Sequence, residues 1–138
     1  MADYDVAIVG CGPAGMTAAI YAARANMKVL LLDKLAPGGQ IVNTFSIGNY
    51  PGMEEVGGAD LAISMFEQTQ KLGVAFDYAT VEEILDGGEE KTLSCKEGQR
   101  VSCKAVILAT GTRPRMLGVP HEFDFAGSGI SWCAVCDG

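Results

Sequence analysis

The sequence lacks a long apolar segment, an amino-terminal leader pattern and a cluster of basic residues. No stretch reaches the roughly 18 continuous apolar residues that cross a bilayer. Residues 1–5 lead into a strand pattern without the basic and apolar regions of a signal peptide. The 138 residues hold 10 Lys or Arg against 17 Asp or Glu, a net charge of −7, which disfavours nucleic-acid binding. These absences predict a cytoplasmic protein with neither a membrane nor a nucleic-acid partner.

Five cysteines make an odd count, which argues against a framework of structural disulfides. Such disulfides are also rare in the reducing compartment that the missing leader suggests. Any cysteine pair is therefore expected to be catalytic or metal-binding. The chain is 49% hydrophobic, enough for about one domain with a core, and its 18 glycines are many for that size.

The first third of the sequence predicts a β-α-β unit. Residues 4–9 form a short apolar run typical of a buried parallel strand, residues 16–25 an alanine-rich helix, and residues 28–32 a second buried strand. Between the first strand and the helix lies Gly10-x-Gly12-x-x-Gly15. These glycines allow a tight turn, close approach of the backbone to a pyrophosphate, and close helix packing.

Asp33 ends the second predicted strand, eighteen residues after Gly15. A carboxylate at that place can accept hydrogen bonds from an adenosine ribose, although a strand-end acid is often only a solvated surface group. A lone glycine motif is weak evidence. Here the strand, the helix and the acid all lie at the expected places around the motif. The combination predicts a dinucleotide-binding site and disfavours a glycine-rich turn in an unrelated α/β domain.

The rest of the chain predicts a mixed architecture. Residues 35–57 show no regular periodicity. Their aromatic and aliphatic side chains favour an ordered loop that covers a ligand. Residues 58–72 return to helical spacing. Short strands are expected at 74–76, 79–85, 91–96, 100–103 and 105–109. The predicted fold class is therefore α/β: a Rossmann-like domain with a parallel sheet, helices and a small β-meander.

Two further motifs carry chemistry. Ala109-Thr110-Gly111 follows an apolar strand and, alone, is as consistent with a simple strand end. Cys133-Ala-Val-Cys136 places two cysteines where a disulfide can form across a turn at a helix start, and a helix dipole there favours the reactive thiolate. Asp137 adjoins the pair as a candidate proton donor or acceptor.

A zinc site is the alternative interpretation of the cysteine pair. It would need two more ligands, and Cys95, Cys103 and His121 do not have the usual short spacing. Redox chemistry is therefore favoured over zinc, and no metal site is predicted. Cys11, Cys95 and Cys103 are interpreted as structural thiols, since a buried cysteine commonly behaves as a small hydrophobic residue.

Taken together, the motifs resemble those of the low-molecular-weight thioredoxin reductases over essentially the whole chain. They are Gly10-Cys-Gly-Pro-Ala-Gly15, Gly38-Gly39-Gln40, Asn49-Tyr50-Pro51-Gly52, Ala109-Thr110-Gly111 and Cys133-x-x-Cys136-Asp137-Gly138. The resemblance implies an FAD-binding domain of the two-dinucleotide flavoprotein type, present here in incomplete form. It implies that FAD is held by Gly10, Cys11, Gly12, Pro13, Ala14, Gly15, Asp33, Lys34, Gly39, Gln40, Asn49, Val81, Ala109, Thr110 and Gly111.

The resemblance also implies roles for the last motif. Cys136 would face the isoalloxazine and take its electrons, Cys133 would attack the disulfide of thioredoxin, and Asp137 would act as the acid–base group. Thioredoxin or a thioredoxin-like protein is the implied partner, and a homodimer the implied assembly. Cys11 departs from the small residue that is common at its position, a change we expect to be tolerated.

Length is the larger departure from the family. The resemblance implies that residues 1–115 form the first part of the FAD domain and residues 116–138 the hinge and opening of an NADPH and dithiol domain. No second glycine-rich fingerprint for NADPH is visible. We therefore expect no NADPH-driven turnover and a weakened FAD affinity from this chain alone. The alternatives left open are a reductase driven by ferredoxin or another flavoprotein, a peroxiredoxin-reducing flavoprotein, and an FAD-binding fragment without turnover.

Overall fold

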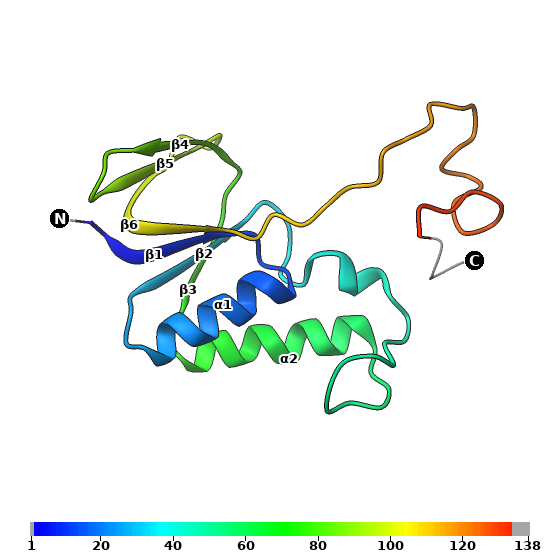
Figure 1. Cartoon of the computed structure of the whole chain (residues 1–138), viewed down its shortest axis with the longest axis horizontal. Coiled ribbons are helices and arrows are strands. Elements are labelled where there is room, and N and C mark those ends of the chain that lie inside the picture. Colours follow the sequence, from blue (N-terminus) through cyan, green and yellow to red (C-terminus); the bar gives the residue numbers. More distant parts are fainter. Residues whose placement is uncertain (1, 134–138) are drawn as a thin grey trace.

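The computed structural model describes residues 2–133 and shows three layers: a central sheet, two helices on one face, and a β-hairpin over the other (Figure 1). The elements are β1 (Tyr4–Val9), α1 (Pro13–Arg24), β2 (Val29–Asp33), the 3₁₀ helix η1 (Gly39–Asn43), α2 (Gly58–Lys71), β3 (Ala75–Tyr78), β4 (Val81–Asp86), β5 (Lys91–Cys95) and β6 (Arg100–Leu108). The α/β class and the β-α-β start are thus as the sequence predicts.

The sheet has the strand order β3-β2-β1-β6-β5-β4. β1 is central and parallel to both β2 and β6, and β2 is parallel to β3. β4, β5 and β6 form the predicted antiparallel meander. The chain leaves β1 toward β2 on one side and returns as β6 on the other. The carboxyl end of β1 is therefore a topological switch point, where ligands of such sheets bind.

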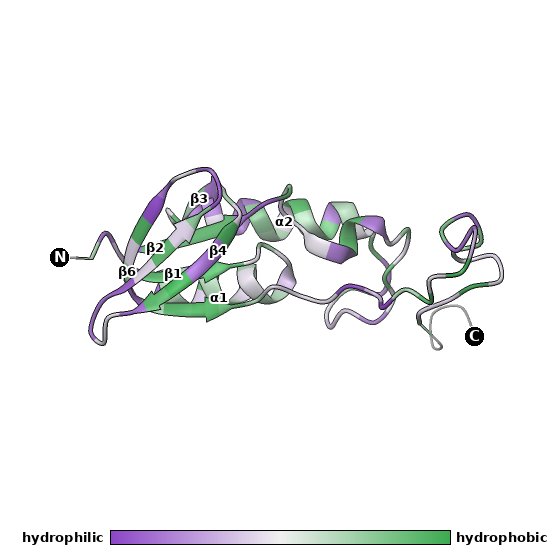
Figure 2. Ribbon diagram, turned by 90° about the horizontal axis from the view of Figure 1, so that it is seen from above, coloured by the Kyte–Doolittle hydropathy of each residue, from purple (hydrophilic) through white to green (hydrophobic). Residues whose placement is uncertain are grey.

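Two apolar clusters hold the layers together. The first, between the sheet and the helices, contains Ile8, Met16 and Leu31, none of which is exposed. The second, on the opposite face, contains Leu32, Leu93 and other side chains of the sheet. Because successive strand residues point to opposite faces, the apolar residues of β1 and β2 supply both clusters. Figure 2, coloured by hydropathy, shows hydrophobic stretches along the strands of the sheet.

The predicted element bounds differ from the structure in several places, among them β4, which spans Val81–Asp86 rather than 79–85. α1 begins at Pro13 rather than residue 16, since proline suits the first helical position. The 3₁₀ helix η1 lies inside the stretch expected to be irregular, and β3 spans Ala75–Tyr78 rather than 74–76. The two strands expected at 100–103 and 105–109 are the single strand β6. Lys104 lies within this strand with an exposed side chain, and its ammonium lies 2.6 Å from the Asp5 carboxylate.

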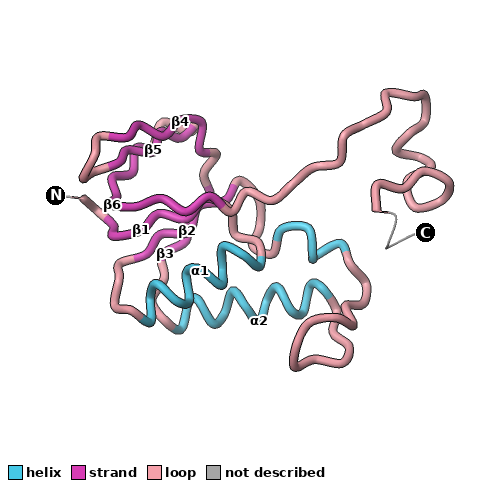
Figure 3. Tube along the Cα trace, viewed as in Figure 1, coloured by secondary structure: helices cyan, strands magenta, loops and turns pink. Residues whose placement is uncertain are grey.

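Beyond β6 the chain runs away from the three layers as an extended segment and ends in a compact loop (Figure 3). Within residues 2–133, no helix combines the length and the apolar character that a membrane crossing requires.

Candidate functional site

The turn from β1 into α1 is packed so closely that only glycine fits at two of its positions. Gly10 has φ +110°, and a Cβ there would overlap the carbonyl oxygen of Ala109. A Cβ on Gly15 would overlap the carbonyl oxygen of Gly10 and lie 3.0 Å from its carbonyl carbon. Gly10 and Gly15 are thus needed for the fold itself, because they let α1 approach β1 and the end of β6.

The amino-terminus of α1 is left open toward the end of the sheet. Gly12 is the N-cap, with an extended backbone and no side-chain cap, and Pro13 follows at the first helical position. The first amides of a helix have no partner within it and carry the positive end of its dipole. This helix start is therefore suited to an anion such as a pyrophosphate.

Asp33 connects the glycine-rich turn to the loop that follows β2. Its Oδ2 accepts a hydrogen bond of 2.7 Å from the amide of Cys11, and its Oδ1 accepts one of 3.0 Å from the amide of Leu35. Each carboxylate oxygen has a further lone pair, so hydroxyl groups of a ligand can still donate to it. The predicted acid thus lies beside the glycine turn and also holds its shape.

A second loop lies against the first. The amide of Gly38 donates to the carbonyl of Cys11 over 2.8 Å. Gly39, with φ +60°, lies so near Gly12 that a Cβ on it would be 3.1 Å from the Gly12 Cα. Gln40 follows on η1 with an exposed side chain. Two glycine-containing backbones therefore meet at the start of α1.

An open cleft of about 160 Å³ lies at the carboxyl ends of β1 and β2. It is lined by Val9, Gly10, Leu32, Asp33, Lys34, Ala79, Thr80, Val81 and Thr110. Five of these were singled out from the sequence: Gly10, Asp33, Lys34, Val81 and Thr110. The cleft therefore joins the glycine turn to the start of β4 and to the end of β6.

Some cleft residues carried no motif of their own. Thr80 lies just before the predicted Val81, and its amide is held by the Glu97 carboxylate at 3.0 and 3.2 Å. This bond lowers the pKa of Glu97. Val9 and Leu32 could have been found from their places at strand ends next to the motif. The role of Thr80 depends on a pairing 17 residues away, which no local pattern shows.

Other predicted residues lie around the cleft or apart from it. Ala109 follows β6, with its amide bound to the carbonyl of Val9 at 2.8 Å. Ala14 is exposed on the first turn of α1, and Gly111 is exposed just beyond the cleft. Asn49 lies in the loop closed by the bridge between Ile47 and Val56. The structure therefore does not bring Asn49 into the lining of this cleft.

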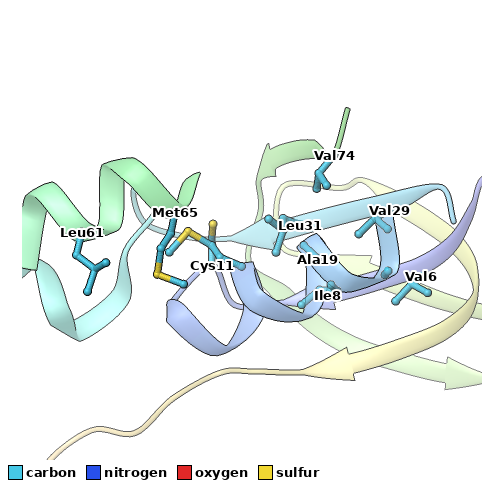
Figure 4. Close-up of a cluster of buried hydrophobic side chains, with 11 residues drawn as sticks. Val6, Ile8, Cys11, Ala19, Val29, Leu31, Leu61, Met65 and Val74 are labelled. Atoms are coloured by element: carbon cyan, nitrogen blue, oxygen red, sulfur yellow. The ribbon is translucent and has the colours of Figure 1, made fainter. Parts of the chain in front are cut away.

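Cys11 lies in the middle of the site, but its thiol points into the core. The side chain is fully buried in the cluster that includes Met65 and Leu31 (Figure 4). Burial, with a smaller contribution from the Asp33 charge, raises the pKa of this thiol to about 12. Cys95 and Cys103 are likewise buried and free, with pKa values raised mainly by burial. These observations fit the interpretation of all three as structural thiols.

Cys133 differs from these thiols because it is disulfide-bonded. Its amide donates a hydrogen bond of 3.0 Å to the hydroxyl oxygen of Ser131, and that hydroxyl donates one of 3.1 Å to the carbonyl oxygen of Cys133. Cys136 and Asp137 lie outside the described residues. Within the described part of the chain, no group of three His, Cys, Asp or Glu side chains could hold a metal ion.

The arrangement fits the adenine dinucleotide that the motifs imply. A pyrophosphate can lie at the open start of α1, where Gly12 and Gly39 offer backbone without side chains. The adjoining cleft can take an adenosine, with its ribose at Asp33. Both parts of the site lie at the switch point of the sheet.

Comparison with known proteins gives one consistent result. The family model for pyridine nucleotide-disulphide oxidoreductases matches residues 4–138. Thioredoxin reductase of Bacillus subtilis is 46% identical over 98% of this chain, and that of Listeria innocua 43% identical over 98%. The crystal structure of thioredoxin reductase from Streptococcus pyogenes superposes with a TM-score of 0.87 at 46% identity over 97% of the chain. The chain spans 42% of both curated relatives and 44% of the Streptococcus structure.

Proposed function

Because the chain belongs to the pyridine nucleotide-disulphide oxidoreductase family, we propose that it is the FAD-binding and disulfide-bearing first part of a thioredoxin reductase. The observation that carries this proposal is the combination of an uncapped helix start and an Asp33-lined cleft with a disulfide at Cys133 in one chain. The names and identities of the relatives from Bacillus and Listeria support it.

In this proposal the residues of the chain bind and orient the cofactor. The amides at the start of α1 hold the pyrophosphate, Asp33 accepts hydrogen bonds from the ribose, and Val81 and Thr110 enclose the adenosine end. Gly39, Gln40 and Asn49 belong to the ribityl and flavin end. Once reduced by two electrons from a donor, the bound flavin would supply an electron pair for reduction of a disulfide.

The disulfide is the second half of the proposed chemistry. Cys136 takes the electron pair, Cys133 attacks the disulfide of thioredoxin, and Asp137 exchanges the proton. NADPH is the proposed donor, bound by the part of the longer protein that follows residues 1–115 and the hinge from residue 116. We further propose that the longer protein is cytoplasmic, since the free buried thiols suit a reducing compartment. A homodimer is proposed from the family resemblance alone.

Counting electrons tests the proposal without NADPH or thioredoxin. The chain is loaded with FAD, unbound flavin is removed, and dithionite is added anaerobically while flavin absorbance is followed. We expect uptake of about four electrons per chain, about two for the flavin and about two for the disulfide. The Cys133→Ser variant should bind FAD equally and take up only about two.

Two results would contradict the proposal in different ways. If titration of the chain with FAD at equilibrium shows no binding, the chain lacks the proposed cofactor site. If the loaded wild-type chain and the loaded Cys133→Ser variant take up the same number of electrons, the chain has a flavin but no redox disulfide.

A further inference from the structure

The connection between β3 and β4 forms one wall of the cleft. β3 and β4 are the two edges of the six-stranded sheet, yet only Ala79 and Thr80 join them. In a flat sheet these edges would lie about 24 Å apart, whereas the chain from Tyr78 to Val81 spans at most about 11 Å. The sheet therefore curls so that its edges approach each other here, and the chain rises from β3, among the parallel strands, to β4 in the layer above (Figure 1).

Three backbone groups of this connection are held by hydrogen bonds that come from different parts of the sheet. The amide of Ala79 donates to the carbonyl of Asp33, at the end of β2, over 3.0 Å. The carbonyl of Thr80 accepts a bond of 2.9 Å from the amide of Lys96. The amide of Thr80 donates to the carboxylate of Glu97, 3.0 Å from Oε2 and 3.2 Å from Oε1. Only the third group is held by a side chain, so a substitution can release it alone.

Glu97 reaches Thr80 from the turn between β5 and β6. The backbone of this turn is closed by the amide of Cys95, which donates to the carbonyl of Gln99, and by the amide of Gly98, which donates to the carbonyl of Cys95, each over 2.9 Å. Glu97 is exposed, and the bond from the Thr80 amide holds the pKa of its carboxyl below the ordinary value. The carboxylate is therefore charged at neutral pH and bound to backbone, unlike a freely solvated surface acid.

The released group would belong to the cleft itself. Thr80 lies between Ala79 and Val81, and all three line the cleft together with Asp33. Ala79 stays bound to the Asp33 carbonyl when Glu97 is removed, so the freedom gained is confined to Thr80 and Val81. A ligand that packs against this wall must then order it again, which lowers its affinity.

We propose that Glu97 is a positioning residue for the adenosine end of the cofactor, which it serves by holding the Thr80 amide and with it the cleft wall at Thr80 and Val81. Glu97 does not line the cleft, so its effect passes through Thr80. The inference rests on the proposed function in one respect, namely that this cleft binds the adenosine of FAD.

The test compares two substitutions of Glu97 in the flavin-free 138-residue chain by equilibrium titration of FAD fluorescence. Glu97→Ala removes the acceptor, whereas Glu97→Gln removes the same charge and keeps one acceptor oxygen. We expect Glu97→Gln to stay within about twofold of the wild type and Glu97→Ala to bind FAD roughly fivefold more weakly. Loss of a negative charge would by itself favour an anionic ligand, so the change in charge does not account for weaker binding.

Hydrogen exchange at the Thr80 amide, followed by NMR on the same flavin-free chains, reports the bond directly. We expect slow exchange in the wild type and in Glu97→Gln, and exchange at least about tenfold faster in Glu97→Ala. Equal exchange in all three chains would mean that Glu97 does not hold this amide, and the inference would be wrong.

The matched control is Asp86→Ala, at the opposite end of the β4–β5 hairpin. Asp86 is also exposed; its Oδ1 accepts a bond of 2.9 Å from the amide of Gly88 and lies 3.3 Å from the Lys91 ammonium. The substitution therefore removes the same charge and the same kind of bond away from the cleft, and FAD affinity should stay within about twofold of the wild type.

Two outcomes of the titration would overturn the inference: equal FAD affinities of Glu97→Ala and Glu97→Gln, or an equal loss of affinity in Asp86→Ala. If the wild-type chain binds no FAD at equilibrium, the proposed cofactor site itself is overturned.

Discussion

Two alanine substitutions, three residues apart in the glycine-rich turn, should separate binding of the flavin from stability of the fold. At Gly12 the backbone φ is −80°, which any residue adopts, and a Cβ would meet only the Gly39 Cα, at 3.9 Å. At Gly15 a Cβ would overlap the carbonyl oxygen of Gly10. The same chemical change therefore has room at one position and none at the other.

The magnitudes follow from this difference. Gly12→Ala should change the free energy of unfolding by less than about 0.5 kcal/mol, because no native contact is disturbed. Its methyl group lies where the pyrophosphate approaches the backbone, so we expect FAD affinity to fall at least about tenfold, or about 1.4 kcal/mol. Gly15→Ala must move α1 away from the turn, and it should lose about 3 kcal/mol of stability.

The assays are urea denaturation followed by circular dichroism on the flavin-free chain, and titration of FAD fluorescence on the same preparations. Ser64→Ala is the control, since Ser64 is exposed within α2, alanine suits a helix, and the residue lies outside the proposed pyrophosphate contact. If Gly12→Ala binds FAD like the wild type, the pyrophosphate does not approach Gly12. If Gly15→Ala unfolds at the wild-type urea concentration, the close approach of α1 to Gly10 is wrong.

Two further predictions follow from perturbed titrations. The pKa of the Cys11 thiol is raised to about 12, so iodoacetamide at pH 8 should modify it at least about 100-fold more slowly in the native chain than in urea. Peptide mass spectrometry measures both rates. Comparable rates would mean that the thiol is not enclosed. The pKa of Glu122 is lowered from an ordinary 4.5, so its bonds stabilise the loop above that value and are lost as the pH falls through the lower, folded-state pKa. Hydrogen exchange at the Leu117 and Gly118 amides should therefore stay slow from neutral pH to about pH 5 and lose its protection only below the ordinary value; loss already near pH 6 would contradict this assignment.

The sequence was most informative where one local pattern determines both element and site. The apolar run of residues 4–9, the glycines after it and Asp33 are close in the chain, so periodicity and spacing were enough to place them. The composition predicts a helix from residue 16, whereas α1 begins three residues earlier at Pro13, because the glycine-rich turn ends at Gly12 and proline suits the first helical position.

Features that depend on distant partners could not be predicted in the same way. The sequence pattern predicts two strands on either side of residue 104, whereas the structure has one strand, in which Lys104 pairs with Asp5, 99 residues earlier in the chain. Glu122 looked like one acid among many in a weakly patterned linker, since its burial depends on how Leu117 and Gly118 fold back onto it. Local propensity carries no information on such contacts, which only the folded chain brings together.

The bonds that Asp33 makes to the amides of Cys11 and Leu35 have a consequence for how a ligand arrives. Those amides already hold the walls of the cleft in place, so little backbone has to be frozen when the nucleotide enters. Binding should then resemble insertion into a rigid receptor, with little loss of conformational entropy from the protein. The adenosine end of the cofactor would then enter a part of its site that is ordered before the cofactor arrives.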